Sequence, residues 1–238
     1  RFGTTLCSFA KSMATADAKI REIENVPATH RQMLKSSEHQ KCAPAVESEL
    51  NSLRERKTWN IVERPDGHKI IDSRWTFRKK INPDGSIRHK ARLVARGFKQ
   101  VKGVNYFETY APTLSLNTFR TLMSFAAMND LTINNFDITT AFLCGIVDAD
   151  IHVEVPQGLD RIDAETLKKF KDPVVKLNKT LHGIRQAPRQ FATHLMTNLK
   201  LFGFKRLKSD PCVHVIDHNG RKLWHLHASR LQGQELDA

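Results

Sequence analysis

The residues of this sequence best suited to chemistry form a dense group of cations. Between His68 and Lys102 there are eleven lysines or arginines and two acids, so this stretch alone supplies nine of the thirteen net positive charges. Guanidinium and ammonium groups bind phosphate oxygens, and a polyphosphate releases its counterions when they do so. The stretch therefore predicts a partner that carries phosphates.

The cations lie on two segments in which apolar and polar residues alternate. Residues 74–81 and 86–95 have a period of two and predict a β-hairpin around the turn residues Asn82, Pro83, Asp84 and Gly85. One predicted face is apolar and carries Trp75, Phe77, Ile81, Ile87, Ala91 and Leu93. The other is cationic and carries Arg78, Lys80, Arg88, Lys90 and Arg92. An ordinary half-buried hairpin with a solvated charged face is the alternative, and the five like charges favour phosphate binding.

The other elements follow from hydrophobic periodicity. It predicts a helix opened by Pro44 that ends near Lys57, a second at residues 118–128 capped by Asn117, and a third from residue 187 that Gly203 terminates. Residues 131–138 are apolar and β-branched and predict a strand with Asp137 at its end. A polar run at 160–172 predicts a short exposed helix, so the chain mixes helices and strands.

Composition narrows the class of protein. With 40% hydrophobic and 26% charged residues the chain is typical of a globular protein, and no apolar run approaches the roughly 18 residues of a membrane span. The four cysteines show no CxxC or other regular spacing, which favours a reducing compartment and a cytoplasmic or nuclear location over secretion. The spacing of Cys212 and the histidines that follow it fits no familiar zinc pattern.

Five segments occur in an order that resembles the landmarks of Ty1/copia-type retrotransposon reverse transcriptases. They are ELNSLRERKTW (49–59), KARLVARGFKQ (90–100), GVNYFETYAP (103–112), FDITTAFLCG (136–145) and LHGIRQAPR (181–189). One such segment can arise by chance, whereas five in order indicate the reverse transcriptase part of a Pol polyprotein. The resemblance implies an α+β fold, the fingers and palm of a right-handed polymerase, with a basic fingers β-hairpin and an incomplete palm sheet. It divides the chain into an N-terminal extension (1–43), the fingers and palm (44–228) and a C-terminal tail (229–238).

The resemblance also implies a set of functional residues. Asp137 matches the first catalytic palm aspartate and, with the adjacent Ile138, is implied to bind the two Mg²⁺ ions of phosphoryl transfer. A lone Asp would more often cap a turn, and plain core packing is the alternative for Phe142. Contacts to a deoxynucleoside triphosphate are implied for Lys90, Arg92, Phe142, Gly183, Arg185 and Gln186. Contacts to an RNA or DNA template–primer are implied for Arg78, Lys80 and Arg88.

The sequence departs from the family pattern after Cys212. A second palm element with two adjacent aspartates is expected there, but no Asp-Asp pair occurs in the 238 residues. Asp148 and Asp150 are the nearest substitute and lie in the loop after the predicted palm strand. Because the two-ion site needs more than one carboxylate, the sequence predicts a catalytically incomplete polymerase truncated before its second motif. A non-catalytic nucleic-acid-binding remnant is the alternative.

Overall fold

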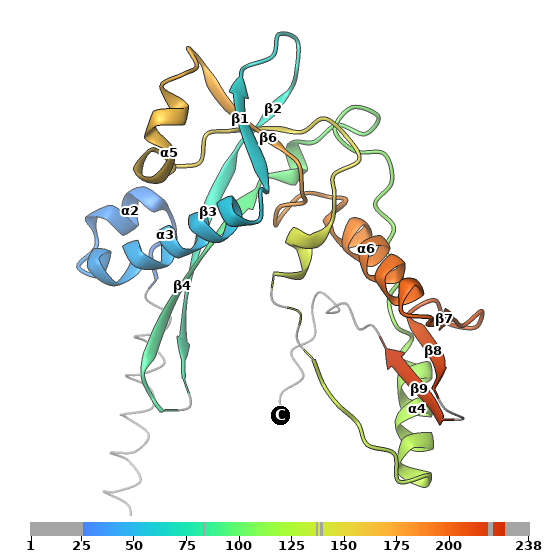
Figure 1. Ribbon diagram of the computed structural model, residues 1–238. Helices are drawn as coiled ribbons and strands as arrows, with labels where there is room; N and C mark the ends of the chain where they lie inside the picture. The colour runs from blue at the N-terminus through green and yellow to red at the C-terminus, as the bar shows by residue number, and fades with distance from the viewer. Residues whose placement is uncertain (1–25, 83, 137, 139, 219–220, 227–238) are drawn as a thin grey trace, which may run out of the picture. The chain divides into compact units, whose positions relative to one another are not determined.

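The computed structural model describes residues 26–82, 84–136, 138, 140–218 and 221–226. The described residues form two compact units: the first contains those at 26–96 and 152–176, and the second contains those at 97–151 and 177–226. Both units combine helices with strands (Figure 1), which agrees with the predicted α+β class. Within the described part of the chain, no helix combines the length and the apolar character needed to cross a membrane.

A four-stranded sheet forms one core of the first unit. Its order is β1 (Trp59–Glu63), β6 (Pro173–Leu177), β5 (His152–Glu154) and β2 (Ile70–Ile71). β2 pairs with β5 in parallel, whereas β5 and β6 are antiparallel. Four β-branched residues of these strands, each at most 1% exposed, fill the interior: Ile71, Val153, Val174 and Val175.

The cation-rich segments form a separate antiparallel pair. β3 (Ser73–Ile81) and β4 (Ile87–Ala95) match the predicted strand bounds to within one residue and pair along their whole length. Trp75 and Phe77 are buried, and the Trp75 indole N–H donates to the carbonyl of Gln157 at 3.0 Å. Ile81 was predicted on the apolar face but is 48% exposed, because it lies at the open end of the pair beside the turn.

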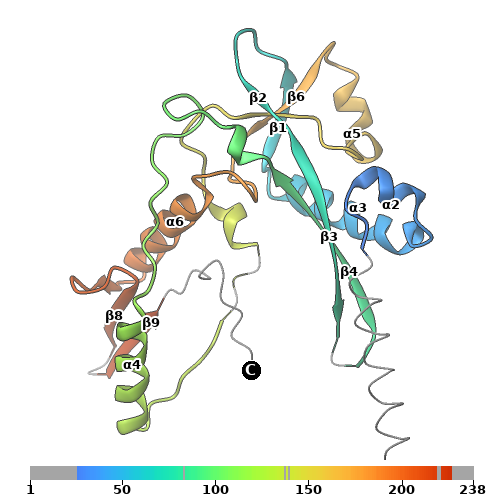
Figure 2. The ribbon, with the colours of Figure 1, turned by 180° about the vertical axis from the view of Figure 1, so that it is seen from behind.

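α3 (His39–Glu55) packs along β4 in both ribbon views (Figures 1 and 2). It buries the apolar stripe Cys42, Val46, Leu50 and Leu53. The helix was predicted to begin at Pro44 but begins five residues earlier, after α2 (His30–Lys35). Pro44 lies inside the helix and its missing N–H removes one helical hydrogen bond, while the turn before it is closed by the Cys42 N–H donating to the Glu38 carbonyl.

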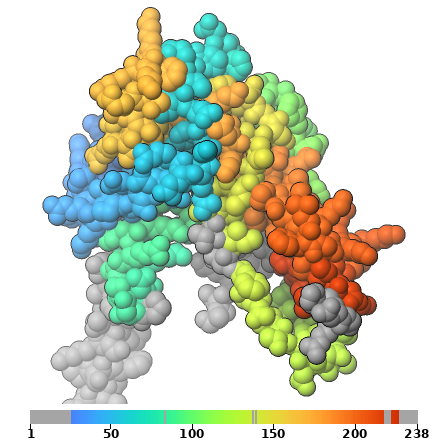
Figure 3. Space-filling view, viewed as in Figure 1, coloured from blue at the N-terminus to red at the C-terminus, as the bar shows by residue number. Residues whose placement is uncertain are grey.

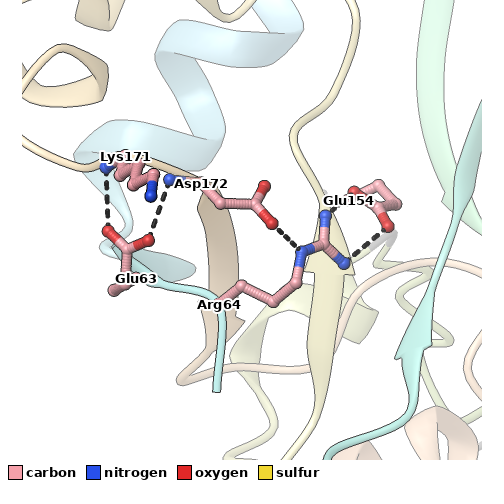
Figure 4. A network of polar contacts seen from close by, with 5 residues as sticks. All are labelled: Glu63, Arg64, Glu154, Lys171 and Asp172. Carbon is pink, nitrogen blue, oxygen red and sulfur yellow. Dashed lines mark hydrogen bonds and ion pairs between the residues drawn. The ribbon is translucent and has the colours of Figure 1, made fainter. Parts of the chain in front are cut away.

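A polar network ties the end of β1 to the neighbouring strands (Figure 4). The Glu63 carboxylate accepts hydrogen bonds from the backbone N–H groups of Lys171 and Asp172 at 2.9 and 2.8 Å. Arg64 binds Glu154 with two parallel N–H donors and Asp172 with a third, and these bonds raise its pKa. The network holds β1, β5 and the segment before β6 in register, whereas α5 (Asp160–Leu167) buries none of its residues and stands on the surface in Figure 3.

The second unit is built on two helices and a small sheet. Its elements are η1 (Gly97–Lys99), α4 (Leu116–Met128), η2 (Ala141–Cys144), α6 (Ala187–Leu201), β7 (Lys205–Arg206), β8 (Val213–His218) and β9 (Arg221–Leu226). η2 packs beside α6, and β7, β8 and β9 form an antiparallel sheet. Gly203 ends α6 with a φ of +90°, as predicted, whereas Phe202 lies past the helix end and is 74% exposed.

Two predictions for the second unit were wrong. Residues 131–136 and 138 form no strand, because a strand exists only through its ladder bonds and no described strand pairs with them. α4 begins at Leu116 after Ser115, not after Asn117. The reason is Asp210, whose buried carboxylate accepts the Ser115 N–H at 3.1 Å and so fixes the start of the helix from 95 residues away.

Candidate functional site

The cationic face of β3 and β4 places like charges directly opposite one another. Arg78 is the register partner of Lys90, and Lys80 is the partner of Arg88. Arg78, Lys80, Arg88 and Arg92 are exposed, and Lys90 is half-buried. Like charges at opposite positions destabilise an antiparallel pair. The arrangement therefore has the electrostatics of a surface that binds an anion rather than of one that serves the fold alone.

The pKa of Lys90 reflects burial and the close spacing of these cations. Its pKa is lowered, first by burial and then by the charges of Arg92, Lys80 and Arg88. Glu49 of α3 is the acid beside this group: burial raises its pKa, while a hydrogen bond from the Leu93 backbone and the charges of Arg92 and Lys90 oppose the rise. A bound phosphate oxygen would relieve the repulsion among these cations.

The opposite face of the pair holds a cation that the sequence analysis missed. Lys79 lies on the same face as Trp75 and Phe77, and its side chain is 2% exposed. Its ammonium contacts the Glu38 carboxylate at 2.8 Å, and the His89 ring lies 3.8 Å from the same carboxylate. The signal available in the sequence was a Lys at an apolar position of the alternation. The partner Glu38 is 41 residues away and could not be identified from it.

In the second unit, a buried amide cluster surrounds Gln186. The Gln186 side chain is fully buried, donates to the Asn105 carbonyl at 2.9 Å and accepts from the Gln100 amide at 3.0 Å. Gln100 in turn accepts the Arg185 N–H at 2.8 Å, and the Asn105 side chain accepts the Val101 N–H at 3.1 Å. Here Gln186 holds two loops together, and its contact with a nucleotide stays a prediction.

Gly183 and Arg185 lie against η1. Gly183 has a φ of +93°, and its carbonyl oxygen approaches Gly97 so closely that no Cβ could stand there. The Arg185 guanidinium donates to the Gly97 carbonyl at 3.1 Å and lies over the Tyr106 ring, 5.3 Å from its centroid. These contacts link the two loops, 97–106 and 183–186, within the second unit.

Phe142 is half-buried in η2. Its ring meets His182 and Phe191 edge-on, at centroid distances of 5.7 and 6.2 Å. Its carbonyl accepts a hydrogen bond from the Thr180 hydroxyl. The ring thus packs against Phe191 of α6, as a core residue would, and its contact with a sugar stays a prediction.

The family follows from comparison with known proteins. Residues 56–224 match the family model described as reverse transcriptase (RNA-dependent DNA polymerase). This chain belongs to that family. Its relatives place it among the Ty1/copia-type Pol polyproteins, and no solved structure matches it.

Three relatives of this reverse transcriptase domain illustrate the match. It is 34% identical over 189 residues to the Retrovirus-related Pol polyprotein from transposon TNT 1-94 of Nicotiana tabacum, covering 79% of this chain and 14% of that protein. It is 36% identical over 195 residues to the Pol polyprotein from transposon RE1 of Arabidopsis thaliana, covering 81% and 13%. It is 27% identical over 187 residues to the Transposon Ty1-ER2 Gag-Pol polyprotein of Saccharomyces cerevisiae, covering 74% and 10%. The chain thus spans about one seventh or less of the length of these relatives.

Reverse transcriptases generally use Mg²⁺, and the described residues do not supply a site for it. No group of three or more His, Cys, Asp or Glu side chains forms a metal site among them. Asp137 lies outside the described residues, Ile138 is 43% exposed, and Asp148 and Asp150 are exposed. His214 and His225 are cross-strand neighbours with ring centroids 6.2 Å apart, and burial lowers the pKa of both, but no third described ligand joins them.

The residues predicted to contact the nucleotide fall into two groups. Lys90 and Arg92 belong to the first unit, whereas Gly183, Arg185 and Gln186 belong to the second with Phe142. Within the second unit the structure brings the distant Gln100 against the neighbouring residues Arg185 and Gln186. Sequence reasoning missed Gln100 and Asn105. Both lie inside family landmarks, so the motifs could have identified them, whereas the alternation of polar and apolar residues could not.

Proposed function

We propose that this reverse transcriptase domain is the template- and nucleotide-binding part of an RNA-directed DNA polymerase. β3 and β4 act as the fingers, with Arg78, Lys80 and Arg88 on the backbone of an RNA or DNA template–primer. Lys90 and Arg92 contact the triphosphate of the incoming deoxynucleotide. The observation that supports this proposal most is the face of β3 and β4 on which Arg78 opposes Lys90 and Lys80 opposes Arg88.

The palm role belongs to the second unit in this proposal. Asp137 is the metal-binding carboxylate, Phe142 contacts the sugar, and Gly183, Arg185 and Gln186 shape the loop that receives the base. Support comes from the family match, which spans all of these positions. The proposal divides the chain as the sequence analysis did, with the fingers and palm at residues 44–228.

Removing charge from the cationic face is expected to weaken binding to an RNA–DNA duplex and to flatten its salt dependence. The double variant Lys80→Gln/Arg88→Gln removes two exposed cations that oppose each other. Each lost phosphate contact lowers the slope of log K against log salt by about 0.9, so the double variant should lower it by roughly 2. Fluorescence anisotropy with a labelled duplex over a salt series measures both quantities.

The matched control is Arg31→Gln/Lys35→Gln, which removes two exposed cations from α2. Its slope should stay close to that of the unaltered chain. Equal losses in the two double variants would show that net charge alone drives binding, and the assignment of β3 and β4 as the phosphate-binding face would be wrong.

We further propose that this chain does not extend a primer by itself, because it carries no adjacent pair of aspartates. A primer-extension assay with Mg²⁺ on an RNA template should show no product for the chain or for Asp137→Ala. A version in which an Asp-Asp hairpin follows residue 226 should form product that Asp137→Ala abolishes. Product from the unaltered chain that disappears with Asp137→Ala would refute the inactivity. Binding without product in every version would favour the alternative, a non-catalytic nucleic-acid-binding remnant.

A further inference from the structure

The segment from η1 to the start of α4, green in Figure 1, has polar side chains buried and aromatic side chains exposed. Its amides are inside: Gln100 and Asn105 are 6% and 2% exposed and bond to the fully buried Gln186. Its aromatic rings are outside: Phe98 is 70%, Phe107 50% and Tyr110 75% exposed. Single exposed apolar residues are ordinary on a protein surface, but three exposed aromatic rings within 13 residues of one segment are not.

The first part of the segment, residues 97–106, is held by several contacts, and Phe107 follows it directly. The Gln186 side chain donates to the Asn105 carbonyl, and the Arg185 guanidinium donates to the Gly97 carbonyl. Lys102 and Tyr106 form a β-bridge within the loop. Phe98 lies in the 3₁₀ helix η1. Because the backbone at Phe98 is already ordered, this ring loses little conformational entropy when a flat ligand covers it.

The charged side chains around the rings indicate what kind of ligand would bind there. Lys99 and Lys102 are exposed on the loop, and Arg185 and Arg189 lie beside it, against one acid, Glu108, which is 3.8 Å from Arg189. Cations interleaved with exposed rings are the combination that binds single-stranded nucleic acid, because phosphates meet the cations while bases stack on the rings. An apolar protein segment would gain nothing from the surplus of cations.

We infer that Phe98, Phe107 and Tyr110 form a stacking platform for unpaired bases of a nucleic-acid strand, with Lys102 and Arg189 on its phosphates. This inference rests on the proposed function, since a polymerase domain must hold the unpaired part of its template. It adds a base-binding surface to the phosphate-binding face of β3 and β4. The platform contacts only the flat faces of bases, so it binds strands without a preference for their sequence.

The test compares two single strands of equal length, one with bases and one fully abasic, because both carry the same phosphates. The unaltered chain should bind the strand with bases more tightly. The triple variant Phe98→Leu/Phe107→Leu/Tyr110→Leu keeps apolar side chains but removes the rings, and it should lose most of that preference, about tenfold or more. Its salt slope should not change, because no cation is removed.

Phe202→Leu is the matched control, since Phe202 is 74% exposed in the same unit but lies at the end of α6. It should keep the preference for bases. If the unaltered chain binds both strands equally, or if Phe202→Leu loses as much as the triple variant, the platform is refuted while the phosphate-binding face can still stand. Equal binding of both strands would leave an apolar protein segment as the occupant of the rings. Failure of Lys80→Gln/Arg88→Gln to weaken either strand would instead refute the proposed function.

Discussion

Gly97→Ala is expected to unfold the loop that carries Gln100 and Asn105. A Cβ at residue 97 would overlap the carbonyl oxygen of Gly183 and stand 3.0 Å from the Cα of Ile184. Both neighbours are backbone atoms, so neither can move aside as a flexible side chain does. We expect a loss of about 3 kcal/mol or more in the stability of this region.

Hydrogen exchange at the Arg185 N–H, which donates to Gln100, measures the local effect. Gly103→Ala is the matched control in the same loop: Gly103 has a φ of +83° but nothing within 4 Å of a Cβ, so it suffers only conformational strain of about 1 kcal/mol. If Gly97→Ala costs no more than Gly103→Ala, the close approach of the two loops is not a structural constraint.

Glu38→Gln is expected to destabilise the first unit by about 3 kcal/mol, because it removes the carboxylate that neutralises the buried ammonium of Lys79. The hydrogen bond from Lys79 lowers the pKa of Glu38 below its ordinary 4.5. A carboxylate with a lowered folded pKa stabilises the fold above its unfolded pKa, and this stability is lost as pH falls through the folded value. Glu38→Gln should therefore flatten the fall in stability below about pH 4.5.

Urea unfolding followed by tryptophan fluorescence measures this effect, since Trp59 and Trp75 are both buried in the first unit. Lys79→Met should cost less than Glu38→Gln, because the Glu38 side chain is 24% exposed and can be hydrated whereas that of Lys79 is 2% exposed. The double variant should recover most of the loss caused by Glu38→Gln. A single Glu38→Gln variant as stable as the double variant would mean that the pair contributes nothing.

Local patterns were enough to locate several elements. The bounds of β3 and β4 follow from an alternation of period two, because each face of a pleated strand meets a different environment. The end of α6 follows from Gly203, since a left-handed backbone favours glycine. The family followed from five short motifs that occur in order, and the comparisons confirmed it.

Contacts between distant residues could not be predicted. The predicted strand at 131–138 failed because apolar, β-branched residues favour a strand only when a neighbour supplies the ladder bonds. The start of α4 was misplaced because its N-cap residue Ser115 is held by the distant Asp210, and the buried Lys79 was missed because its counter-charge is Glu38. In each case the deciding partner lies well outside the few residues that a local pattern samples.

The sequence by itself determined the family, the local strands and helices and the cluster of cations, because composition, periodicity and motifs are properties of neighbouring residues. Only the tertiary structure decided that Gln186 is buried and hydrogen-bonded to a second loop, and that Phe98 and Tyr110 are exposed. It also decided that Arg78 and Lys90 are register partners across β3 and β4. Burial and opposition depend on which segments pack together across 80 or more residues or across a strand register. That packing is set by the balance of buried area and satisfied hydrogen bonds over a whole unit, which no local pattern contains.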